Sequence, residues 1–171
     1  MNRLGLWLFI VSESALFSAF LFSRYYLTGT SQPEGLNISL GFVITAVLLA
    51  SSFFAYRAER SISRGDRRGF LMSTLITIGL GILFLVGVGF EWKEALAEFP
   101  PPDLFGTVFF TLTGLHASHL ISGLVLLVLM FFHGRRGGYS VESHWGVEAI
   151  VRYWHFVDVV WLFVFPTLYL V

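Results

Sequence analysis

Three ionisable side chains lie inside the last long apolar segment of the sequence. Arg152, His155 and Asp158 recur at intervals of three, so they fall along one face of a helix, and Glu148 lies four residues before Arg152. An ionised side chain near the centre of a membrane helix costs about 2.5–3.5 kcal/mol, so it normally faces protein, water or a partner charge. The pattern therefore indicates either a reactive polar site or a set of contacts between helices.

A second carboxyl group, Glu13, lies in the first apolar segment at a depth similar to that predicted for Asp158. Two interior carboxyl groups at one depth could form a proton-active, carbodiimide-reactive site. Alternatively, each could be protonated or hydrogen-bonded and stabilise helix packing. We favour a role in helix packing, because the sequence shows no continuous chain of polar residues that would cross the subunit.

His116 and His119 are three residues apart in the fourth apolar segment, a spacing that could serve a metal ion. A metal or haem site would need further ligands, and cysteine is absent from the sequence. We therefore expect hydrogen bonds between helices instead. The similar depths of His119 and His155 predict that these two side chains meet. No catalytic residue and no metal ligand is predicted.

The segments that must position these residues are those of a membrane protein. Of the 171 residues, 56% are hydrophobic and only 13% are charged, which is too apolar for an ordinary soluble domain. Five segments are long enough to cross about 30 Å of hydrocarbon as helices. We predict an all-α integral membrane protein, a single domain over residues 1–171, with transmembrane helices at about 4–27, 36–59, 68–96, 104–133 and 148–170.

Nine of the eleven basic residues lie at segment ends that would face one side of the membrane. By the positive-inside rule, the N terminus and the second and fourth connections are cytoplasmic, and the C terminus is outside. The net charge is zero, which gives no indication of a nucleic-acid partner. The residues expected to contact lipid head groups or lie at an interface are Arg57, Arg60, Arg64, Arg67, Arg68, Glu148, Arg152 and Trp154.

Several motifs resemble those of one known family. Arg152-Tyr-Trp-His-Phe-Val-Asp-Val-Val-Trp161, preceded by Gly146-Val-Glu-Ala149, resembles the C-terminal signature of cytochrome c oxidase subunit III. Gly114-Leu-His-Ala-Ser-His-Leu120 resembles the preceding helix of that family, and Phe9-Ile-Val-Ser-Glu-Ser-Ala-Leu-Phe17 resembles the helix with its carbodiimide-reactive glutamate. Gly65-Asp-Arg-Arg68 and Phe90-Glu-Trp92 fit in order between them.

The chain departs from the family in two respects. Many members have seven helices, and the present chain is similar to the shorter, five-helix form of several bacterial oxidases. Arg152 stands where the family usually has an aromatic or small residue, and it could pair with Glu148 or with a lipid phosphate.

The resemblance implies a non-catalytic core subunit of a haem-copper terminal oxidase in the bacterial plasma membrane. It would support assembly, bind phospholipids and sustain proton uptake by subunit I. Haem and copper would reside in partner subunits, and the partners would be subunit I directly, subunit II and a larger respiratory supercomplex. Two alternatives stay open: subunit III of a quinol oxidase or a nitric oxide reductase-associated protein, and, in another class, a free-standing proton-coupled carrier that uses Glu13, His155 and Asp158.

Overall fold

The computed structural model describes residues 3–29, 38–98, 100 and 103–170. These residues form five helices: α1 (Arg3–Thr28), α2 (Ile38–Ser63), α3 (Arg67–Glu98), α4 (Leu104–Arg135) and α5 (Trp145–Tyr169). Each is long and apolar enough to cross a membrane. The predicted all-α, five-helix membrane fold is confirmed, whereas the single domain over residues 1–171 stays a prediction.

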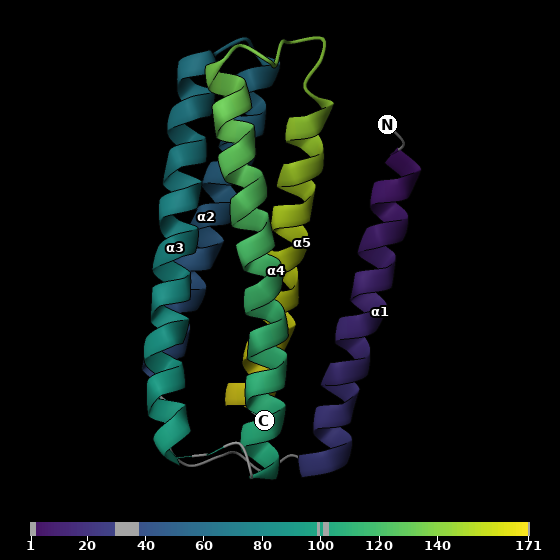
Figure 1. The fold of residues 1–171 in the computed structure, drawn as a ribbon, viewed down its shortest axis with the longest axis vertical. Helices are drawn as coiled ribbons and strands as arrows, with labels where there is room; N and C mark the ends of the chain where they lie inside the picture. Colours follow the sequence, from purple (N-terminus) through teal and green to yellow (C-terminus); the bar gives the residue numbers. More distant parts are fainter. Residues whose placement is uncertain (1–2, 30–37, 99, 101–102, 171) are drawn as a thin grey trace.

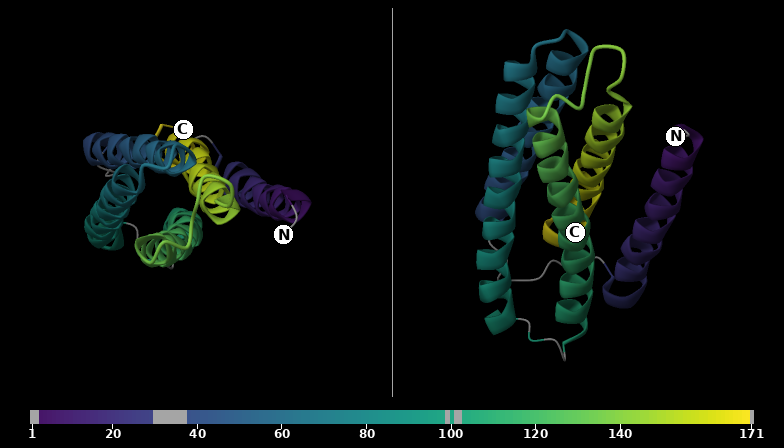
Figure 2. Two further views of the ribbon diagram at one scale, coloured as in Figure 1. Left: turned by 90° about the horizontal axis from the view of Figure 1, so that it is seen from above. Right: turned by 45° about the horizontal axis from the view of Figure 1, so that its top comes forward.

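The helices alternate in direction, and four of them form a bundle (Figure 1). The N-terminal end of α1 and the α2–α3 and α4–α5 connections lie at one end of the molecule, and the C-terminal end of α5 lies at the other. Seen from above, α2, α3, α4 and α5 surround a common core, and α1 stands outside it next to α5 (Figure 2). Within the described part of the chain, α1 contacts only α4 and α5.

The different burial of α1 and α5 follows from this arrangement. Only Phe17 and Arg24 are buried on α1, whereas α5 buries residues on most sides, including Trp154 and Trp161. Apolar side chains make up most of the remaining surface of α1, which suits a helix that faces lipid, because lipid tails are as apolar as leucine.

Trp154 lies at the centre of the four-helix bundle. It is fully buried. Its indole ring occupies the space opposite two glycines: a Cβ at Gly81 of α3 would lie 2.8 Å from Trp154 Cη2, and one at Gly123 of α4 would lie 3.0 Å from Cε3. The prediction that Trp154 lies at an interface or contacts lipid is therefore wrong. Because α5 is enclosed by the other bundle helices, this ring is a core residue.

We expect Gly81→Ala to destabilise the protein by about 1–3 kcal/mol, because the new methyl group would overlap Trp154 and also lie 2.9 Å from Leu124 Cδ2. Gly79→Ala is the matched control on the same helix, since a Cβ there meets nothing within 4 Å. Thermal unfolding of the two variants in detergent measures the difference. Equal melting temperatures would contradict close packing at Gly81.

Candidate functional site

The polar residues of α5 contact α2 through one serine. Ser52 Oγ lies 2.5 Å from Asp158 Oδ2 and donates to it, and it lies 2.7 Å from His155 Nδ1. Asp158 is buried, and its second oxygen, Oδ1, has no hydrogen-bond partner among the described residues. The predicted polar face of α5 is thus turned towards α2, where a single hydroxyl group serves two ionisable side chains.

This trio contains the residue types of a hydrolytic triad but not its connectivity. In a serine hydrolase the imidazole lies between the hydroxyl and the carboxylate, so that it can take the proton of the serine. Here the serine hydroxyl lies between the histidine and the aspartate and donates to the carboxylate. Asp158 therefore does not orient the imidazole of His155 as in a hydrolytic triad, and the arrangement is a contact between helices.

Two tryptophans of α5 add hydrogen bonds to the same face of α2. Trp154 Nε1 donates to Ser51 Oγ at 3.0 Å, and Trp161 Nε1 donates to Thr45 Oγ1 at 2.9 Å. Our sequence interpretation missed Thr45, Ser51 and Ser52. The available signal was hydroxyl residues inside an apolar segment, since serine and threonine commonly form hydrogen bonds between membrane helices.

Glu13 and His119 link α1 to α4. Glu13 Oε2 lies 3.0 Å from His119 Nε2, and both side chains are only partly exposed, at 20% and 15%. His119 Nδ1 lies 2.9 Å from the carbonyl oxygen of Leu115, which can only accept, so Nδ1 carries a proton. Between Nε2 and Oε2 the pair then shares one further proton, either as two neutral groups or as an ion pair.

The predicted meeting of His119 with His155 is wrong. His119 pairs with α1 and His155 with α2, and Tyr153 is the α5 residue that reaches His119, by donating to its carbonyl oxygen at 3.1 Å. Glu13 and Asp158 likewise belong to different helix interfaces. These residues lie at similar depths along the helices, but the rotation of each helix about its axis selected its partner.

His116, the other predicted polar residue of α4, is enclosed by aromatic rings. It is 1% exposed, and its imidazole lies 4.9 Å from the ring of Trp161 and 5.9 Å from that of Phe84 between centroids. Glu91 is a buried carboxyl group that the sequence interpretation missed. Over the described ranges, no group of three or more His, Cys, Asp and Glu residues could hold a metal ion.

The ends of α1 and α5 meet in a charged cluster at the end of the molecule that contains the N terminus. Arg152 Nη2 donates to Glu148 Oε2 at 2.9 Å, as the four-residue spacing predicted, and Arg3 Nη2 lies 3.9 Å from the same oxygen. Both guanidinium groups also lie over the ring of Trp145, at 5.1 Å for Arg3 and 5.3 Å for Arg152. The cluster holds the first turn of α1 against α5.

The five arginines around the α2–α3 connection are all exposed but have different contacts. Arg67 donates through Nε to Gly134 O at 3.2 Å and through Nη2 to Arg135 O, so it satisfies carbonyl groups at the C-terminal end of α4. Arg60 Nη1 donates to Tyr56 Oη at 3.0 Å within α2. Two cavities lie beside α3: Arg68 lines both, Arg57 lines one of them, and Arg64 lines neither. The predicted contact of these arginines with lipid stays a prediction.

Comparison with known proteins identifies similar chains. The model of a family described as cytochrome c oxidase subunit III matches residues 2–171. The cytochrome c oxidase subunit 3 of Tragelaphus imberbis is 37% identical over 180 residues, which cover 98% of this chain and 68% of that protein. The subunit 3 proteins of Bos taurus and Hippopotamus amphibius are each 36% identical over the same shares of the two chains.

We expect Ser52→Ala to destabilise the bundle by about 1–3 kcal/mol, because among the described residues Ser52 is the only hydrogen-bond partner of the Asp158 carboxyl group and of His155 Nδ1. Ser118→Ala is the control, since this exposed hydroxyl only donates to Leu115 O in its own helix. Thermal unfolding of both variants checks the prediction, and equal shifts in melting temperature would contradict a stabilising role for Ser52.

Proposed function

We propose that this chain, which belongs to the cytochrome c oxidase subunit III family, supports its oxidase without carrying out redox chemistry itself. Membership of the family makes it a multi-pass subunit of a haem-copper oxidase, with other oxidase subunits as partners. The proposal adds direct contact with subunit I, further contacts with subunit II and a respiratory supercomplex, and roles in assembly, lipid binding and proton uptake.

One observation carries the non-catalytic role. Four ionisable side chains at the centre of the molecule are engaged with one another or with a serine across helix interfaces: Glu13 with His119, and His155 and Asp158 with Ser52. The imidazole of His116 is packed among aromatic rings, without a hydrogen-bond partner in the described part of the chain. Each contact joins two helices, which is the usual work of polar groups inside a membrane bundle. A redox cofactor would instead need its ligands directed into one cofactor-sized space.

The groove between α1 and α5 supports the proposed role in lipid binding. It has a volume of about 410 Å³ and is lined mainly by apolar side chains, including Phe22 on α1 and Phe163 on α5. The hydroxyl groups of Ser14 and Ser18 also line it, but both donate at 2.7 Å to carbonyl oxygens of α1 itself. A phospholipid acyl chain fits these walls, because they offer hydrocarbon rather than free polar groups.

The proposed contribution to proton uptake depends on Glu13 and His119. The hydrogen bond between them joins α1 to the bundle, and both side chains retain partial exposure. Such a pair can exchange a proton while the contact between its atoms is kept. In this role the pair would stabilise α1 and respond to proton supply without being part of the oxygen-reducing centre.

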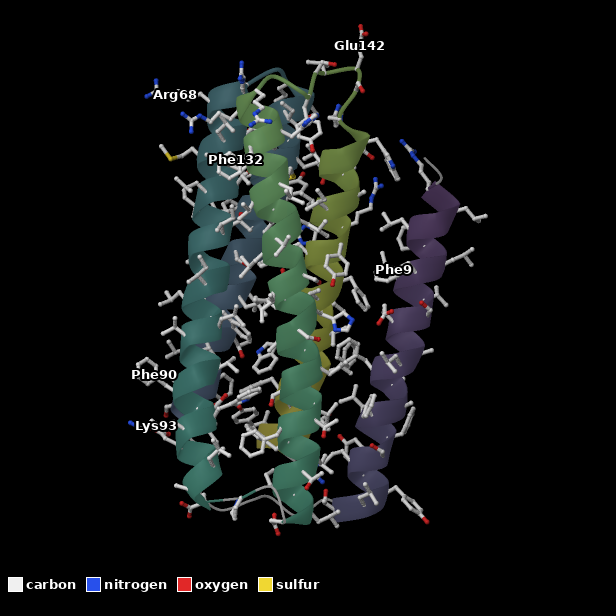
Figure 3. The ribbon with its side chains drawn as sticks, in the orientation of Figure 1. Phe9, Arg68, Phe90, Lys93, Phe132 and Glu142 are labelled. Carbon is white, nitrogen blue, oxygen red and sulfur yellow. The ribbon has the colours of Figure 1, made fainter. Side chains whose placement is uncertain are left out.

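We place the arginine-rich end of the molecule in the cytoplasm, with Lys93 near the opposite surface (Figure 3). Because the natural chain has no cysteine, single cysteines can report this orientation. In right-side-out vesicles, a membrane-impermeant maleimide should modify Glu94→Cys but not Glu142→Cys, and inverted vesicles should reverse the result. Both positions are exposed. The opposite labelling pattern would reject this orientation.

Location in a bacterial plasma membrane stays a prediction, which membrane fractionation of the source cells checks.

Co-purification tests the proposed function. A tagged chain extracted in mild detergent should bring down a haem protein, and the haem spectrum of that protein would distinguish a cytochrome c oxidase from a quinol oxidase or a nitric oxide reductase. Recovery of the chain alone would contradict the proposal and favour the free-standing carrier.

Within that complex, we expect Glu13→Gln and Asp158→Asn to weaken assembly or shorten sustained turnover while the haem spectrum of assembled complex stays native. Each change weakens one polar contact between helices, at a cost of about 1–3 kcal/mol. Glu142→Gln is the control, because this exposed loop residue projects away from the bundle (Figure 3). Loss of a haem band in fully assembled complex would argue against a non-catalytic role.

A further inference from the structure

Two cavities flank α3 at its arginine-rich end. The first lies between α3 and α4 and has a volume of about 450 Å³. Its walls combine two arginines with apolar side chains nearer the membrane centre: Arg67, Arg68, Leu71, Met72, Leu75 and Phe131. It therefore has a cationic end and a hydrocarbon end.

The second cavity lies on the other side of α3, against α2, and has a volume of about 290 Å³. It has a similar order of residues along the membrane normal, with arginines at the end of the bundle and, below them, side chains that are apolar apart from Ser73. The residues that give it this character are Phe54, Arg57, Asp66, Arg68, Met72 and Ile76.

Arg68 and Met72 line both cavities and form a ridge between them. They are one turn apart on α3 and both are exposed. Arg68 projects from the outer side of α3, away from the bundle (Figure 3). From Arg68 to Ile76 the ridge and its grooves extend about 12 Å along the helix, at 1.5 Å per residue.

The charge at the head of the two grooves is positive. Asp66 is the acidic residue in the wall of the second cavity, and its Oδ1 accepts from Gly69 N at 2.8 Å at the start of α3. Within the ranges described, neither Arg57 nor Arg68 forms an ion pair with a carboxylate. The guanidinium of Arg67 is directed to carbonyl groups of α4. Arg57 and Arg68 are therefore the cations available to a ligand.

We propose that one anionic glycerophospholipid binds astride α3, with its phosphate between Arg57 and Arg68 and one acyl chain in each groove. The two grooves match the two chains of such a lipid, and the shared arginine lies where its head group must lie. Inorganic phosphate would use the arginines but leave both apolar grooves empty. This site is separate from the groove between α1 and α5, and it rests on the proposed function only in placing this end of the molecule at a membrane surface.

Photoactivatable phosphatidylglycerol, added to the purified complex in mild detergent, tests the site. Cross-linked peptides should map to the α3 segment 71–76. Arg57→Gln with Arg68→Gln should weaken this labelling about fivefold for each arginine removed. Arg64→Gln is the matched control: it removes the same charge from the same connection but lines neither cavity, and its labelling should be unchanged.

Met72→Trp tests the grooves without altering charge, since a large ring on the ridge would narrow both of them. We expect it to reduce labelling at 71–76 as strongly as the double arginine variant does. Full labelling of Met72→Trp, equal loss in Arg64→Gln, or displacement of the lipid by excess inorganic phosphate would each overturn the proposal. The haem protein in the same preparation shows that the complex is intact, so failure of the lipid site is distinguishable from failure of the proposed function.

Discussion

Polar side chains inside this molecule depend on hydrogen-bond partners within the protein, because hydrocarbon offers them none. Lipid tails also compete equally with apolar side chains for contact, so burial of leucine or phenylalanine gives membrane helices little reason to associate. Hydrogen bonds and close packing must then select the arrangement. Here α5 makes most of these hydrogen bonds: its Trp154, Asp158 and Trp161 all bond to hydroxyl groups of α2.

The enclosed position of α5 explains the division of the molecule into a bundle and an outer helix. Small residues on α3 and α4 admit the ring of Trp154, and the bonds to α2 close the remaining side. Helix α1 is attached differently, at separate levels: the Arg3 and Glu148 cluster at one end, Glu13 with His119 in the middle, and Tyr25 beside Thr167 at the other end, where the two hydroxyl oxygens are 3.4 Å apart. Between the last two levels α1 and α5 leave the apolar groove open.

This construction suits a subunit that supports a catalytic partner. Glu13 pairs with His119, and Ser52 contacts both His155 and Asp158. The outer surfaces of the molecule carry grooves lined in part by apolar side chains. The arginines at one end divide between two tasks. Arg67 satisfies the carbonyl groups at the end of α4, whereas Arg57 and Arg68 present charge beside open grooves. Exposed arginines of one connection thus have different physical roles, although their sequence pattern is uniform.

Sequence alone determined the five membrane-spanning segments, because a helix needs about 20 apolar residues to cross the hydrocarbon and each segment carries them locally. It also placed Glu148 beside Arg152, since residues four apart on one helix are neighbours whatever surrounds them, and the structure shows the two side chains paired. Only the tertiary structure decided that His119 meets Glu13, that His155 and Asp158 share Ser52, and that Trp154 is a core residue. Hydropathy and residue spacing fix the depth of a side chain in the membrane. The choice of its partner depends on the order of the helices and on the rotation of each helix about its axis. Both are set by the packing of each helix against all of its neighbours, which a single segment of sequence does not contain.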